Sequence, residues 1–200
     1  MSRMQRMRTL SPSLLLAASS LLTGCALQDP KPTSAAPATS TTATMPKITP
    51  ALWFPNDAEP AVRFYVSVFA DGKILDEARW PEGGFGPKGS LISATIRIAG
   101  MELLAISGNT QSTFNQSMSL MVTCETQAEM DTYWQKLSVD GKGQCGWIKD
   151  KFGVTWQIIP RELLTMMADK DPAKVKRVSE AMMPMEKLDL AALRRAYAGK

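Results

Sequence analysis

The sequence predicts an α+β fold that consists of two similar halves followed by a helical tail. The order strand, helix, strands occurs twice, beginning near residues 48 and 118, and such repetition indicates a duplicated module. Within several strands apolar and polar residues alternate, so each sheet is expected to bury one face. Residues 161–200 instead carry apolar side chains at helical spacing.

The first half is expected to hold one helix and four strands. Asn56-Asp57 is expected to open the helix, and Asp71-Gly72 to close it. A two-residue turn at Ala99-Gly100 would place Arg97 opposite Glu102, which predicts a cross-strand ion pair on the polar face. The expected strands are 48–54, 73–80, 91–98 and 101–107.

The second half repeats this order in a shorter form. Thr126 is expected to cap its helix, with Glu129 at the third helical position of a capping box. The expected strands are 118–124, 144–149 and 154–159, with a turn at 150–153. In the last strand Trp156 would face the helix and Gln157 the opposite side.

The N-terminal residues resemble a bacterial lipoprotein signal. Arg3, Arg6 and Arg8 precede an apolar stretch that ends in Leu22-Thr23-Gly24-Cys25. This resemblance implies a signal peptide over 1–24, lipid attachment at Cys25 and an envelope protein facing the periplasm; Ala26 favours the outer membrane. An ordinary secreted protein is the alternative. Residues 25–46 contain almost no large apolar side chains and are expected to form a disordered tether.

Charge and composition exclude several classes of function. Residues 25–160 carry 11 basic and 13 acidic side chains, which argues against nucleic acid as a partner although the whole chain has a net charge of +4. The chain has no histidine, so histidine-based catalysis and imidazole metal ligands are excluded.

Two blocks of sequence resemble a known family. Ile48–Phe54 with Ala58–Phe69, and then Gln144–Pro160, resemble the PhnB-like branch of the glyoxalase/bleomycin-resistance (vicinal oxygen chelate) superfamily. The resemblance implies a domain over 47–160 in which paired βαβββ modules form a curled sheet around a cleft. It also implies a homodimer, and residues 161–200 are a helical tail outside that domain.

The family's metal positions correspond here to residues that are poor ligands. They fall on Pro50, Leu104, Ser119 and Gln157, whose side chains offer two neutral oxygens and no charged donor. We therefore expect no metal and no cofactor, and the sequence contains no evident set of catalytic residues.

The expected function is binding of a small molecule in this cleft by an envelope lipoprotein. The expected ligand-cleft residues are Pro50, Leu52, Leu104, Ser119, Met121, Trp147 and Gln157. Trp53 and Trp156 are expected in the core. One alternative is an enzyme of the PhnB-like family, either a 3-demethylubiquinone 3-methyltransferase or a glyoxalase-type lyase or dioxygenase. The other is a dimeric interaction module.

Three further features of the sequence each allow more than one interpretation. The Gly84–Gly89 segment matches G-x-G-x-x-G, but a strand follows it, so a flap or a plain loop is favoured over a nucleotide site. Cys124 and Cys145 are either free thiols or a disulfide. The tail is expected to dock on its own domain or on a partner. The alternative is that its basic residues bind a membrane surface; these are Lys174, Lys176, Arg177, Arg194 and Arg195.

Overall fold

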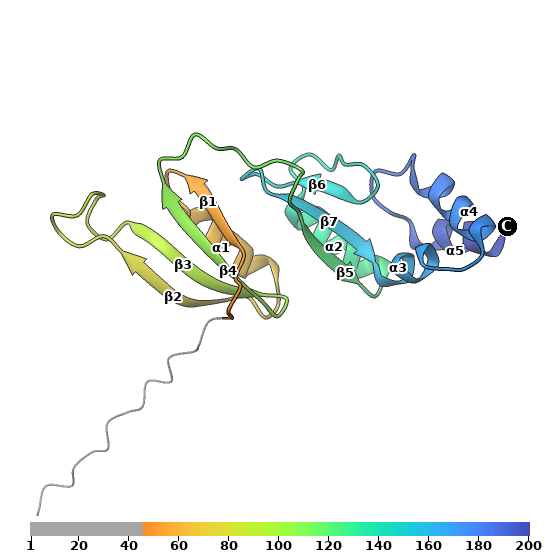
Figure 1. Cartoon of the computed structure of the whole chain (residues 1–200), viewed down its shortest axis with the longest axis horizontal. Helices are drawn as coiled ribbons and strands as arrows, with labels where there is room; N and C mark the ends of the chain where they lie inside the picture. The colour runs from red at the N-terminus through yellow and green to blue at the C-terminus, as the bar shows by residue number, and fades with distance from the viewer. Residues whose placement is uncertain (1–45) are drawn as a thin grey trace, which may run out of the picture. The chain divides into compact units, whose positions relative to one another are not determined.

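The computed structural model describes residues 46–200 (Figure 1). The signal peptide, Cys25 and nearly all of the tether that the sequence predicts lie outside the described residues. Between residues 46 and 200 no helix is both long and apolar enough to cross a bilayer.

The first half forms a four-stranded sheet with one helix packed against it (Figure 1). The strand order is β1-β4-β3-β2, with β1 parallel to β4 and the other pairs antiparallel. The elements are β1 (Ala51–Pro55), α1 (Glu59–Val68), β2 (Lys73–Arg79), β3 (Leu91–Ile98) and β4 (Met101–Gly108).

The second half repeats this arrangement with one strand fewer. Its strand order is β5-β7-β6, which corresponds to β1-β4-β3 of the first half, including the parallel pair. The elements are β5 (Leu120–Cys124), α2 (Gln127–Leu137), β6 (Trp147–Lys149) and β7 (Thr155–Pro160). The expected α+β fold with duplicated modules is therefore confirmed.

Local signals in the sequence explain several of these boundaries. Ala99 and Gly100 both have positive φ, and the turn they form pairs Arg97 with Glu102 as expected. The two side chains make an ion pair of 2.5 Å. Thr126 caps α2 by accepting a hydrogen bond from the Glu129 backbone N–H, whereas the Glu129 carboxylate accepts from the N–H of Glu125.

Strand β6 is shorter than expected because the chain turns sharply just before it. Cys145 and Gly146 have φ of 52° and 84°, and Gln144 and Trp147 exchange both of their backbone hydrogen bonds around them. This geometry is that of a two-residue hairpin turn, so the expected strand 144–149 is interrupted at its second residue. Gln144 is what remains of a fourth strand in this sheet.

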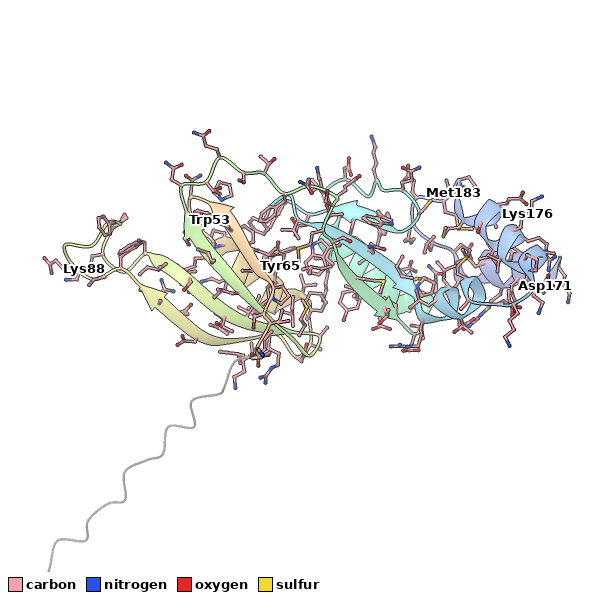
Figure 2. All side chains as sticks on the ribbon, in the orientation of Figure 1. Trp53, Tyr65, Lys88, Asp171, Lys176 and Met183 are labelled. Atoms are coloured by element: carbon pink, nitrogen blue, oxygen red, sulfur yellow. The ribbon has the colours of Figure 1, made fainter. Side chains whose placement is uncertain are left out.

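A buried carboxylate joins the two halves. Asp150 is 4% exposed and accepts four hydrogen bonds, two of them from the backbone N–H groups of Phe152 and Val154. The Tyr65 hydroxyl of α1 donates to its Oδ2 at 2.7 Å, and the Trp156 indole donates to the same oxygen at 2.8 Å. Figure 2 labels Tyr65 on α1. Burial and the Asp150 charge together raise the pKa of Tyr65, which therefore remains a donor.

The tail packs on the second half. It contains α3 (Arg161–Met167), α4 (Pro172–Met182) and α5 (Leu190–Ala198), and Leu188 and Leu193 are fully buried. The N–H groups of the Cys145-Gly146 turn donate to the carbonyls of Met185 and Glu186, which fixes the segment between α4 and α5. Gln127 of α2 holds the same segment through Leu188 and Leu190.

Most of the basic side chains of the tail have partners within the protein. Arg177 donates to the last carbonyls of α5, Arg194 pairs with Glu162, and Lys174 pairs with Asp169. These contacts lie within the tail itself, whereas the ion pair of Lys187 with Asp131 of α2 joins the tail to the second half.

Candidate functional site

The face of the second sheet opposite α2 brings four of the expected site residues together. Met121, Gln157 and Trp147 lie side by side across β5, β7 and β6, because Gln157 is opposite Met121 on one side and Trp147 on the other. The Gln157 amide donates to the Ser119 hydroxyl at 2.7 Å. Met121 is 51% exposed. This surface, defined by these four residues, is called here the second-sheet face.

The corresponding face of the first sheet carries Leu104 but not Leu52. The parallel register sets Leu104 opposite Ala51 and Leu52 opposite Ala105, which is fully buried. Leu52 is 5% exposed in the core, although it also borders a small pocket of about 200 Å³ beside Ser119. Leu52 is therefore a core residue at the margin of this pocket, and its place among the ligand-cleft residues stays a prediction.

Trp53 also departs from the expectation. It is 52% exposed and lies on the Leu104 side of β1, since its neighbours Leu52 and Phe54 point into the core (Figure 2). Its indole lies close to Gly108, where an added Cβ would be 2.6 Å from the ring nitrogen. Trp156, in contrast, is 1% exposed and is a core residue as expected.

Two larger pockets border the second-sheet face. A pocket of about 560 Å³ lies between the halves, where Pro50 and Met101 of the first half meet Ser119 and Met121 of the second. A second pocket of about 520 Å³ lies at the other edge of the sheet. Its lining residues are Gln116, Lys142, Gly143, Gln144, Cys145, Trp147, Ile148 and Lys149. Both volumes are typical of small-molecule sites.

Most residues that line this edge pocket were not predicted from the sequence. Only Trp147 was expected to line a cleft, whereas Lys149 is two residues further along β6 and shares its face. Strand alternation could have found Lys149, because Ile148 between them is buried. Lys142 and Gln144 could not be found this way, since they precede the hairpin turn.

The residues at the family's metal positions do not fit an ion. The side chains of Pro50 and Leu104 carry no atom that could coordinate a metal. The Gln157 amide and the Ser119 hydroxyl are hydrogen-bonded to each other. Among residues 46–200 no group of three or more Cys, Asp or Glu side chains is arranged to hold a metal.

The glycine-rich segment has a structural explanation. It connects β2 to β3 and wraps around Trp80, so that a Cβ at Gly84 or Gly86 would lie 2.7 Å or 2.5 Å from the indole. No helix follows the segment to direct its N-terminus at a phosphate. Phe85 at its tip is fully exposed and packs edge-on against Trp80.

The two described cysteines are free thiols. Cys124 is fully buried on the α2 side of β5, and burial raises the pKa of its thiol to about 12. The Cys145 thiol lies 3.5 Å and 3.6 Å from the carbonyl oxygens of Met183 and Met182. The disulfide that the sequence left open is not formed.

Comparison with known proteins agrees with this architecture. The family described as 3-demethylubiquinone-9 3-methyltransferase matches residues 46–159. A putative 3-demethylubiquinone-9 3-methyltransferase, PhnB protein, from Bacillus cereus is 38% identical, with a TM-score of 0.53 over 57% of this chain and 99% of that chain. A search of curated proteins gave no match.

More distant solved structures were also found. A glyoxylase/bleomycin resistance protein/dioxygenase domain from Frankia is 14% identical, covering 56% of this chain and 95% of that one, with a TM-score of 0.37. A lactoylglutathione lyase from Agrobacterium tumefaciens is 13% identical, covering 60% and 97%, with a TM-score of 0.34.

The two sheets with their duplicated modules are consistent with the βαβββ fold of the vicinal oxygen chelate type. The chain belongs to the PhnB-like family described as 3-demethylubiquinone-9 3-methyltransferase. The tail from Arg161 onward lies outside the family match.

Proposed function

We propose that this protein binds a small molecule on the second-sheet face. The observation that carries the proposal is the row of Met121, Gln157 and Trp147, which no helix of residues 46–200 covers and which two pockets border. The row joins a thioether, an amide and an indole. Such a mixture of apolar surface and a few polar groups is typical of ligand sites.

A thermal-shift screen of small metabolites at neutral pH tests this proposal. A ligand of the second-sheet face is expected to raise the melting temperature of the wild type, and Met121→Ala is expected to reduce that shift. Met183→Ala is the matched control, because Met183 is similarly exposed at 57% but lies in the tail. A screen without any stabilising compound, or equal loss in both variants, contradicts the proposal.

The proposed location is the cell envelope, with the domain held at the outer membrane by lipid on Cys25. Support comes from the order of basic residues, apolar stretch and Leu22-Thr23-Gly24-Cys25 in the sequence. Labelled palmitate is expected to enter the wild type and not a Cys25→Ser variant. Equal labelling of both, or recovery of the wild type in the soluble periplasm, contradicts the anchor.

The proposed assembly is a homodimer. Within residues 46–200 the edge strands are β1 and β2 in the first sheet and β5 and β6 in the second. Trp53, Met118 and Met121 are more than half exposed, and such apolar groups beside open edges favour association. Sedimentation at micromolar concentration is expected to give the mass of two chains, and a monomer contradicts the proposal.

The family description favours methyl transfer as a second candidate. That reaction requires a methyl donor such as S-adenosylmethionine, yet the glycine-rich segment is occupied by Trp80 and does not fit a nucleoside. Equilibrium dialysis with S-adenosylmethionine distinguishes the candidates. Stoichiometric binding supports methyl transfer, and its absence supports a binding function without that donor.

A further inference from the structure

The edge pocket beside β6 is distinguished by its charge. Two of its lining residues are Lys142 and Lys149, and no acidic side chain lines it. Neither ammonium group has a hydrogen bond or an ion pair within residues 46–200. Most other cations of the described region are engaged; Arg79, for example, binds both Glu59 and Glu77.

The two glutamine side chains of this pocket are likewise without partners among residues 46–200. The carboxamides of Gln116 and Gln144 line the pocket, and neither makes a side-chain hydrogen bond within the described part of the chain. Gln116 comes from the segment that joins the halves, and Gln144 from the residue before the hairpin turn. Four side chains from three separate segments therefore offer unused N–H donors to one space.

The floor of the pocket is fixed by the backbone. Trp147 is half-buried and points to the same face as Lys149, because Ile148 between them faces the core. Gly143 allows the chain to pass close to β6, since a Cβ there would lie 2.4 Å from the Trp147 carbonyl and 2.5 Å from the Trp134 ring. The Trp147 indole lines the same pocket as the two lysines and offers a flat apolar ring to a ligand there.

We infer that this pocket binds an aromatic carboxylate. The carboxylate accepts from Lys142 and Lys149, with the two glutamine amides as additional donors, and the ring lies against Trp147. This inference rests on the proposed function, since Trp147 belongs to the second-sheet face, and it specifies the class of ligand.

Calorimetric titration of the full-length chain with 2-naphthoate and with 2-naphthamide tests the inference. The two probes have the same ring system and differ in charge, so the ratio of their affinities isolates the carboxylate. Charge-assisted hydrogen bonds from partly exposed lysines are expected to favour naphthoate by about tenfold at low salt. Increasing the salt concentration is expected to reduce this ratio.

Two double variants locate the effect. Lys142→Gln with Lys149→Gln is expected to abolish the preference for naphthoate. Lys73→Gln with Lys170→Gln removes the same charge from two exposed, unpaired lysines outside the pocket and is expected to leave the preference intact. Trp147→Leu is expected to weaken both probes about equally. All variants change exposed or half-buried side chains, and their melting curves verify that they fold.

The possible results separate this inference from the proposed function. Equal affinity for both probes, or a preference that survives in the Lys142/Lys149 variant, overturns the carboxylate inference and leaves small-molecule binding in place. Inorganic phosphate that displaces naphthoate at the same concentration overturns the aromatic part of the inference. Failure of both probes at millimolar concentration overturns the inference, and the metabolite screen with Met121→Ala then decides the proposed function independently.

Discussion

Removing the Tyr65 hydroxyl tests the role of the buried Asp150 carboxylate in joining the two halves. Tyr65→Phe deletes one of the four hydrogen bonds to Asp150 and leaves the ring packing unchanged. A hydrogen bond to a charged group contributes about 1.5–3 kcal/mol to stability. We therefore expect a loss of about 2 kcal/mol in the free energy of unfolding, or about 4–8 °C in melting temperature for a domain of this size.

Urea unfolding followed by circular dichroism measures this loss. Tyr133→Phe is the matched control, because the Tyr133 hydroxyl has no hydrogen-bond partner among the described residues, and it is expected to change stability by less than about 0.5 kcal/mol. Asp150→Asn is expected to destabilise more than Tyr65→Phe, since an amide NH₂ accepts no hydrogen bond and the two donors that face it lose their acceptor. If Tyr65→Phe and Tyr133→Phe unfold at the same urea concentration, Asp150 does not join the halves as described.

Single contacts of Asp71 and Gln127, and the burial of Cys124, each predict a measurable effect. The Asp71 carboxylate accepts hydrogen bonds from backbone N–H groups of the β3–β4 turn, which lower its pKa below the ordinary value of 3.8. The ionised carboxylate therefore stabilises the fold above pH 3.8, and this stabilisation is lost as the pH falls through the lowered pKa. Asp71→Asn is thus expected to be less stable than the wild type near neutral pH and equal to it in strong acid; a difference that persists in acid contradicts the assignment. Gln127→Ala removes both side-chain bonds to the tail and is expected to speed hydrogen exchange at the Leu190 amide, whereas unchanged exchange would mean that burial alone holds the tail. Iodoacetamide at pH 8 is expected to alkylate Cys145 in the native protein and to spare Cys124, which peptide mapping detects; modification of Cys124 would show that its strand opens.

The features that the sequence predicted correctly depend on nearby residues. The Ala99-Gly100 turn, the Thr126 cap and the two faces of β7 each follow from a few consecutive side chains. Alternation along β7 is unambiguous because Gln157 is polar and Trp156 and Ile158 are not. The order of strands and helices follows from these local signals.

The features that the sequence missed depend on distant pairing. Residues 48–54 are apolar on both faces, so only the register with β4, some 50 residues later, decides that Trp53 is exposed and Leu52 buried. The four-bond environment of Asp150 likewise requires Tyr65, which lies 85 residues earlier. The edge pocket needs the hairpin turn at Cys145-Gly146, whose first residue is unusual in a left-handed conformation and gave no clear signal.

The attachment of the tail to the Cys145-Gly146 turn affects when each half can fold during synthesis. The four strands of the first sheet have all left the ribosome once residue 108 has emerged. The second sheet has only three strands, and the turn before β6 lies close to Leu188 of the tail, which is made well after β7. The two halves are repeats in structure, but the first can mature while the chain is still growing and the second must wait for the tail.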